Sequence, residues 1–138
     1  MFEDIDAVLS FWFGYELDQE KIIADKTDLW WGKNSEHDQY IIESFAGQYQ
    51  RAINGELDHW LQNAKGQLAL IIVLDQFSRV IHRNTREAFS QDKIVLDISL
   101  QGVEVGADKM LSPIERVFYY MPLEHSEDLD TQNKCVEL

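Results

Sequence analysis

Apolar residues recur along most of the chain at intervals of three or four positions, which is the spacing of one face of an α-helix. The first run predicts a helix that ends at Gly14, and a second predicts a helix that begins near Asn34 or Ser35 and ends at Asn54-Gly55. Glycine suits the left-handed residue that commonly follows a helix. No segment alternates apolar and polar residues as a half-buried strand does, so the pattern predicts an all-α fold.

The run "QLALIIVLDQFSRVIH", residues 67–82, is apolar on nearly all sides and predicts a central buried helix. Before it, "ELDHWL" (56–61) predicts a short helical turn that leads to a break at Gly66. After it, "TREAFSQDKIVLDISLQG" (85–102) predicts a further helix, capped by Asn84 or Thr85 and closed by Gly102.

The sequence "SPIE", residues 112–115, is typical of a capping box with proline in the first helical position. The predicted apolar face of the helix that follows comprises Ile114, Val117, Phe118 and Met121. Pro122 is expected to force the preceding residue out of helical geometry, and a last helix is expected from about Ser126 to the end of the chain. In total the sequence predicts about seven helices in a single domain, residues 1–138.

Composition and charge narrow the classes of partner. The chain has 138 residues, of which 45% are hydrophobic and 27% charged, as in one globular domain. Its formal net charge of -13 argues against unspecific nucleic-acid binding and against anionic membrane surfaces, because both need clustered Lys and Arg. No apolar run approaches the roughly 20 residues of a membrane span. Cys135 is the only cysteine and no secretion signal follows Met1, so we expect a cytoplasmic protein without an internal disulfide.

Asp75 interrupts the apolar central run and is therefore expected to be at least partly buried. A buried carboxylate must be paired or protonated. Because Arg79 follows one helical turn later, one interpretation is a structural ion pair between the two side chains, with Gln76 exposed. The alternative is that Asp75 lies in a pocket and acts as a general base. The structural interpretation is favoured, since such pairs usually serve stability.

The segment "RVIHRNTR", residues 79–86, is the only basic cluster in this acidic chain. It adjoins the expected start of a helix near Thr85, where free backbone N–H groups favour an anion. One interpretation is a phosphate or carboxylate pocket anchored by Arg79, Arg83 and Arg86. The other, which is favoured, is an ion-pair network with the acidic segment "EHSED".

The segment "EHSED", residues 124–128, places one histidine among carboxylates. If Ser126 caps the last helix, the acids that follow it lie in the first turn, where they stabilise the helix dipole. Alternatively, Glu124, His125 and Asp128 could bind magnesium or manganese, which prefer such oxygen-rich sets. No second histidine at ligand spacing supports a metal site, so the capping interpretation is favoured and no cofactor is expected.

Five motifs, in order, carry a resemblance: "VLSFWFG", "WWGKN", "GELDHW", "LALIIVLDQFSRVIHRNTREAF" and "YYMPLEHSEDLDTQ". Together they resemble the bacterial DUF924 family. The resemblance implies a helical array similar to tetratricopeptide proteins and a biochemical function that is unassigned. Where that family has a pattern similar to "DQFPRNIFRG", this chain departs from it at Ser78, Val80, His82 and Asn84. The resemblance also implies that the family's C-terminal segment, with a motif similar to "FGRFPHRN", is lacking here.

Two functions of different classes follow. A non-catalytic binding module would take a peptide, a protein partner or a small anion, with the three arginines of the basic cluster as its charged anchor. A hydrolase-type enzyme would use Asp75, Glu124 and His125 for acid–base or metal-assisted chemistry, which requires the three side chains to converge on one cleft. The binding module is favoured over the enzyme.

A last helix that lacks its usual packing neighbour should expose apolar side chains. The residues concerned are Leu129, Val136 and Leu138. This surface predicts a symmetric homodimer formed through the C-terminal helix.

Overall fold

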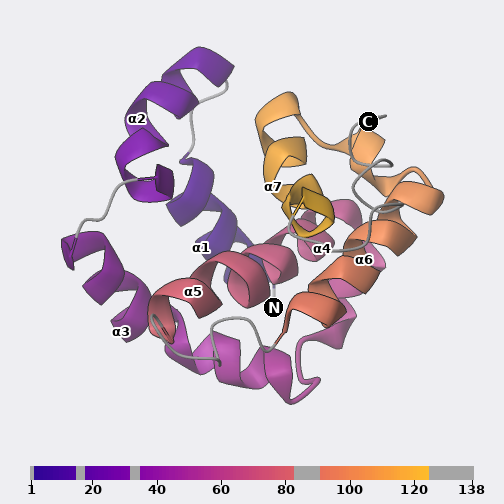
Figure 1. The fold of residues 1–138 in the computed structure, drawn as a ribbon, viewed down its shortest axis with the longest axis horizontal. Coiled ribbons are helices and arrows are strands. Elements are labelled where there is room, and N and C mark those ends of the chain that lie inside the picture. Colours follow the sequence, from indigo (N-terminus) through magenta and orange to yellow (C-terminus); the bar gives the residue numbers. More distant parts are fainter. Residues whose placement is uncertain (1, 15–17, 32–34, 83–90, 125–138) are drawn as a thin grey trace.

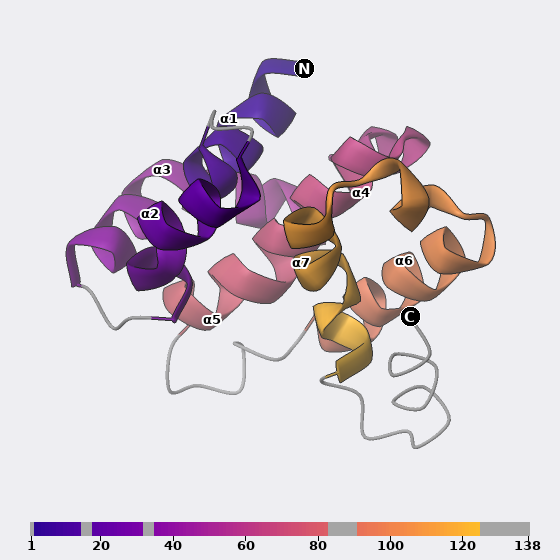
Figure 2. The same ribbon diagram turned by 90° about the horizontal axis from the view of Figure 1, so that it is seen from above.

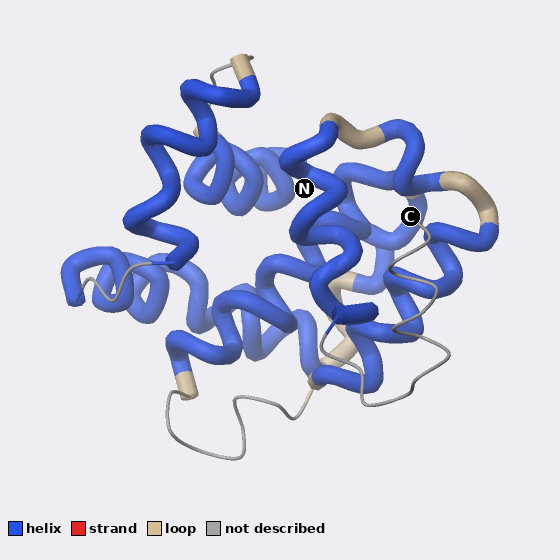
Figure 3. The backbone as a smooth tube through the Cα atoms, turned by 45° about the horizontal axis from the view of Figure 1, so that its top comes forward, coloured by secondary structure: helices blue, strands red, loops and turns tan. Residues whose placement is uncertain are grey.

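The regular elements are helical throughout the part of the chain that the computed structural model describes, residues 2–14, 18–31, 35–82 and 91–124 (Figure 3). The first half forms α1 (Phe2–Phe13), α2 (Gln19–Trp31), α3 (Ser35–Ile53) and the 3-10 helix η1 (Asp58–Gln62). The centre forms α4 (Ala64–Ile71), the π-helix η2 (Ile72–Phe77) and α5 (Ser78–Ile81). The last part forms α6 (Asp92–Glu104), the 3-10 helix η4 (Ala107–Met110) and α7 (Pro113–Glu124). The all-α prediction is confirmed.

The elements α4, η2 and α5 follow one another without a break and form a central helical rod, with α1 to α3 on one side and α6 and α7 on the other (Figures 1 and 2). The helix α3 packs against η2 and α5, whereas α6 packs against α4 and α7. The helix α1 packs against α2 on its own side and against α4 of the central rod. The more specific prediction, a tetratricopeptide-like array, stays a prediction.

The middle of the central rod is buried because its sequence there is apolar on every side. No residue from Leu68 to Leu74 is more than 3% exposed, which confirms the expected central helix. An aromatic cluster fills the space beside it. The ring of Phe118 lies 5.4 Å from that of Trp12 and 5.0 Å from that of Trp30, both in edge-on arrangements that favour aromatic pairs. Trp30 also donates its indole N–H to the backbone oxygen of Trp12 at 2.9 Å.

Three predicted helix boundaries are confirmed. Gly14 and Gly55 follow α1 and α3 with φ angles of 75° and 80°, the left-handed conformation that glycine adopts without strain. At the start of α7, Glu115 accepts a hydrogen bond from the backbone N–H of Ser112 at 2.9 Å. The Ser112 hydroxyl oxygen accepts one from the N–H of Glu115 at 3.4 Å, which completes the capping box.

The other two glycines that were expected to end helices lie inside them. Gly66 belongs to the first turn of α4, which is capped by Asn63 Oδ1 accepting from the Gly66 N–H at 2.8 Å. Gly102 belongs to α6, which continues to Glu104. Neither position has room for a side chain. A Cβ atom at residue 66 would lie 2.0 Å from the backbone oxygen of Trp60, and one at residue 102 would lie 1.5 Å from the hydroxyl oxygen of Tyr119.

The prediction that Pro122 ends its helix is also wrong, since it lies within α7. Proline removes one helical hydrogen bond there, because it has no backbone N–H. Burial of Met121 and Leu123, 8% and 0% exposed, favours the helical path. On the same helix Val117 is 41% exposed and does not belong to the apolar face predicted for it.

Two further elements differ from the sequence prediction. The helix α2 was not expected, because charged residues interrupt its apolar pattern. Among its described side chains, Ile22 and Trp30 are the deeply buried apolar ones. The helix α6 begins at Asp92, since Gln91 leaves the helical conformation with φ and ψ of -102° and 6°. The predicted caps at Asn84 and Thr85 and the last helix from Ser126 lie outside the described residues. No described helix is both long enough and apolar enough to cross a membrane.

Candidate functional site

Asp75 lies in the π-helical segment and its side chain is fully buried. Its Oδ2 atom accepts a hydrogen bond from the side-chain amide of Gln76 at 2.9 Å, so Gln76 is half-buried and not exposed as expected. The backbone oxygen of Asp75 accepts a further bond from the Ser78 hydroxyl at 3.0 Å. With 0% exposure, the carboxylate is out of reach of a substrate in this conformation.

The predicted partner of Asp75 is in place. Arg79 Nη1 lies 3.0 Å from Asp75 Oδ1, and it donates to the Asp75 backbone oxygen at 3.0 Å and to Asp92 Oδ1 at 3.2 Å. Since these two acceptors take both N–H bonds of Nη1, its contact with Asp75 Oδ1 is an ion pair without a directed hydrogen bond. Arg79 therefore joins the central rod to the first turn of α6, with its charge balanced by two carboxylates.

The remaining predicted site residues are not brought together in the described part of the chain. Arg83, Arg86, His125 and Asp128 lie outside it, and Glu124 is the last residue of α7. Within the described residues, no three His, Cys, Asp or Glu side chains form a group that could hold a metal ion. The sites predicted from the basic and acidic segments thus remain predictions. The apolar residues of the expected dimer surface likewise lie outside the described residues.

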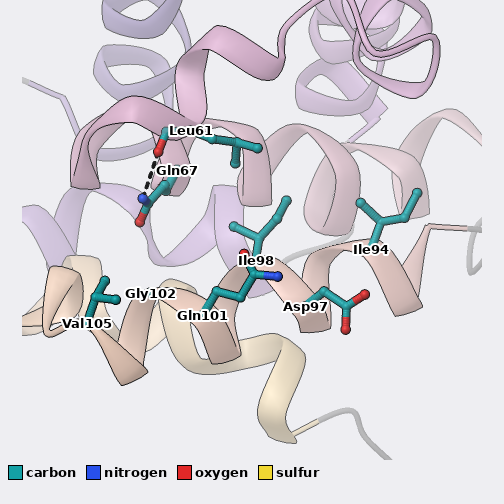
Figure 4. Close-up of a pocket in the computed structure, with 8 residues that line it drawn as sticks. All are labelled: Leu61, Gln67, Ile94, Asp97, Ile98, Gln101, Gly102 and Val105. Carbon is teal, nitrogen blue, oxygen red and sulfur yellow. Dashed lines mark hydrogen bonds between the residues drawn. The ribbon is translucent and has the colours of Figure 1, made fainter.

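A surface groove that the sequence did not predict lies between α6 on one side and η1 with α4 on the other (Figure 4). We call it the α6 groove, and its volume is about 330 Å³. It is lined by Leu61, Gln67, Ile94, Asp97, Ile98, Gln101, Gly102 and Val105. The volume falls at the lower end of the range of small-ligand and side-chain pockets.

The walls of the α6 groove are aliphatic and open to solvent. Leu61 is 37%, Ile94 49% and Val105 78% exposed, so that three large apolar residues face water around one hollow. Single exposed apolar residues are common on protein surfaces, but three of them around one cavity make the α6 groove a candidate site. Ile94 and Ile98 lie one helical turn apart on α6, and Val105 follows the end of that helix.

The floor of the α6 groove is polar and held in place from below. The hydroxyl of Tyr119, a fully buried residue of α7, donates to Gln67 Oε1 at 2.8 Å. Gln67 Nε2 donates to the backbone oxygen of Leu61 at 2.9 Å. The absence of a side chain at Gly102 lets the Tyr119 hydroxyl pass beneath α6 to reach Gln67. Burial, followed by the charges of Asp108 and Tyr120, raises the pKa of Tyr119 far above its ordinary value, so this donor stays protonated.

A second hollow, of about 450 Å³, lies between α1, α4 and α7. Its charged residues are Asp6, Lys65 and Glu115, of which the last two form an ion pair with Lys65 Nζ 2.5 Å from Glu115 Oε2. Burial by itself raises the pKa of the Glu115 carboxyl, but the bonds from Lys65 and Ser112 outweigh it and hold the pKa below its ordinary value. The cation of this hollow is thus already engaged, which makes the α6 groove the stronger candidate site.

Comparisons with known proteins place these features in a family. The family model DUF924, a bacterial protein of unknown function, matches residues 8–138. Among solved structures, the chain is similar to a protein of unknown function from Agrobacterium tumefaciens, with 30% sequence identity and a TM-score of 0.74. This match covers 87% of the present chain and 73% of the Agrobacterium chain. No curated protein matches the chain. The resemblance found in the sequence is confirmed, and neither description names a ligand or a reaction.

Proposed function

Since the chain belongs to the DUF924 family of bacterial proteins of unknown function, its activity must be inferred from its own surface, and we propose that it is a non-catalytic binding module for a peptide or protein partner. The observation that supports the proposal is the α6 groove, where three exposed aliphatic residues surround a cavity of about 330 Å³. A water molecule occupies about 30 Å³ of liquid, so the groove has room for one or two aliphatic side chains.

Burial of one such side chain supplies enough free energy for a specific contact. Transfer of a leucine or isoleucine side chain from water contributes about 1.5–3 kcal/mol, which corresponds to roughly a ten- to hundredfold change in affinity. The charge of the chain favours a basic partner. The formal net charge is -13, and Asp97 lies in the groove itself. An aliphatic side chain beside lysine or arginine would therefore satisfy both the apolar and the charged parts of this surface.

The anion-binding alternative depends on Arg79, Arg83 and Arg86. Arg79 bridges Asp75 and Asp92 and would have to leave both carboxylates to hold a phosphate. The peptide alternative needs no such rearrangement, because the α6 groove is open as it stands. We therefore favour a peptide or protein partner.

Selection from a display library of random peptides tests the proposal. Ile94→Glu places a charge in the α6 groove, whereas Ile23→Glu places the same charge on α2 at a residue of similar exposure, 44% against 49%. We expect selected peptides to bind the wild-type protein and the Ile23→Glu variant equally, and the Ile94→Glu variant at least about tenfold more weakly. Unspecific attraction of basic peptides to an acidic protein would affect both variants alike. Peptides that bind the two variants equally well would refute the proposal.

A further inference from the structure

The fixed amide on the floor of the α6 groove specifies the backbone of its occupant as well as a side chain. We infer that the occupant is an extended peptide segment: one aliphatic side chain fills the groove, a backbone amide pairs with Gln67, and a lysine or arginine two residues away reaches Asp97. This inference rests on the function proposed above and adds to it the conformation and the residue spacing of the partner.

The side-chain amide of Gln67 can form further hydrogen bonds, and its orientation is fixed by the two that it already forms. A glutamine amide has two N–H donors and an oxygen with two lone pairs. In the described part of the chain, Leu61 takes one donor at 2.9 Å and Tyr119 takes one lone pair at 2.8 Å. One N–H and one lone pair therefore remain, on an amide whose orientation is set at both ends. Binding to a group that is already oriented avoids the entropy loss of ordering a side chain.

The remaining donor and acceptor select an extended partner over a helical one. A helix uses its backbone N–H and C=O groups internally, so a helix laid in the groove would cover Gln67 without bonding to it. Covering a polar amide without a partner costs about 1–3 kcal/mol. An extended segment instead presents unpaired N–H and C=O groups along its edge. It can give Gln67 a carbonyl oxygen and an N–H while its side chain enters the apolar part of the groove.

The positions along α6 set the spacing of the two side chains. Gln67 Oε1 lies level with Gly102, 3.2 Å from where a Cβ atom of residue 102 would stand. Asp97 precedes Gly102 by five residues, which is a rise of about 7.5 Å along the axis of α6 at 1.5 Å per residue. Two residues of an extended chain span about 6.6 Å, and residues two apart point to the same side. Figure 4 shows Gln67 and Val105 toward one end of the groove, Ile98 between, and Ile94 and Asp97 toward the other.

Asp97 is suited to hold the cation of the partner. It is exposed, and within the described residues it forms no ion pair. Its carboxylate stands at the end of an aliphatic groove in a chain of formal net charge -13, which attracts a cationic group in preference to an anionic one. An arginine at this end would have its aliphatic stem against Ile94 and its guanidinium at the carboxylate.

The probe is the capped heptapeptide acetyl-Gly-Arg-Ser-Leu-Ser-Arg-Gly-amide, titrated into the ¹⁵N-labelled full chain. Arginine stands two residues to either side of leucine, so either chain direction places one at Asp97. We expect shifts of the Gln67 side-chain NH₂ signals and of the backbone signals of Ile98, Gln101 and Gly102. Methylation of the backbone nitrogen of the leucine, or of the serine that follows it, should weaken binding about fivefold. Methylation of the backbone nitrogen of the C-terminal glycine should not weaken it.

Two protein variants test the charged contact under matched conditions. Asp97→Asn removes the carboxylate of the groove, and Glu104→Gln removes one on the same helix that does not line it. We expect about a threefold loss of affinity for the first and none for the second, as suits a pair exposed to water. Equal losses would show that only net charge matters and would overturn the placement of the cation.

The outcomes separate the inference from the proposed function. If Ile94→Glu leaves the affinity of the heptapeptide unchanged, the groove is not the binding site and the proposed function fails. If Ile94→Glu weakens binding but no N-methylation does, the groove binds side chains without reading the backbone, and the extended conformation is wrong. A helix-forming peptide with the same leucine and arginines that binds more tightly than the heptapeptide would also overturn the inference.

Discussion

Replacement of Gly102 by alanine should destabilise the protein, although the same change normally stabilises a helix. Gly102 lies inside α6, where glycine is about 1 kcal/mol less favourable than alanine. An added Cβ atom would meet the hydroxyl oxygen of Tyr119 at 1.5 Å, its ring carbon Cζ at 2.7 Å and Gln67 Oε1 at 3.2 Å. The first two distances are shorter than any real contact, so the tyrosine must move.

The size of the effect follows from what this movement disrupts. Tyr119 is fully buried, and its displacement breaks the hydrogen bond to Gln67. Loss of that bond costs about 1 kcal/mol. Overpacking of a well-filled interior costs about 1–3 kcal/mol more. Against the gain of about 1 kcal/mol in helix propensity, the net expectation is a loss of roughly 2 kcal/mol in the free energy of unfolding.

Urea unfolding followed by circular dichroism measures the change, and a second glycine provides the control. Gly47 also lies inside a helix, α3, but an added Cβ atom there would meet nothing within 4 Å. Gly47→Ala should therefore stabilise the protein by up to about 1 kcal/mol. Combining Gly102→Ala with Tyr119→Phe removes the closest contact and should recover part of the loss. If Gly102→Ala stabilises the protein as much as Gly47→Ala, the close approach of Tyr119 to α6 is refuted.

Three further predictions concern charged and ionisable groups. Arg79→Leu should lower the free energy of unfolding by about 3 kcal/mol, because it removes the cation paired with the buried carboxylate of Asp75; a loss below about 1 kcal/mol in urea unfolding would contradict the pairing. Because the pKa of Glu115 is lowered on folding, its carboxylate stabilises the folded protein at a pH above the ordinary pKa of 4.5. This stability is lost as the pH falls through the pKa of the folded state. The melting temperature of Glu115→Gln should therefore fall less on acidification than that of the wild type, and equal falls would show that Lys65 does not stabilise the carboxylate. The raised pKa of Tyr119 has the opposite sense: above its ordinary value of 10.0 the unfolded chain releases a proton that the folded protein retains, so stability falls as the pH rises. Tyr119→Phe should lose less stability than the wild type on this alkaline side, and parallel melting curves would refute the burial of the hydroxyl.

Much of the fold could be predicted because local sequence decides it. Glycine ends α1 and α3 at residues where a left-handed conformation is required, and the capping box of Ser112 and Glu115 starts α7. The apolar run of the central rod has no side that could face water. The ion pair between Asp75 and Arg79 is local in the same sense, since a helical turn brings the two side chains together.

Three of the errors share a cause, which is that packing against other parts of the fold decides the structure at the residues concerned. Gly66 and Gly102 are glycine because Trp60 and Tyr119 approach them, not because a helix ends there. Pro122 stays in its helix because its neighbours are buried in the core. A sequence pattern shows where a glycine or proline occurs, but the packing of other segments decides whether it ends a helix or lies inside one.

The sequence by itself determined that the chain is helical, acidic and a member of its family, because helical periodicity, net charge and motif order are properties of the chain alone. Only the tertiary structure decided where a partner could bind. The α6 groove takes residues from η1, α4 and α6, and its floor depends on a tyrosine of α7 that lies 52 positions from Gln67. No local pattern encodes such a meeting, because side chains converge only when helices far apart in the sequence pack together.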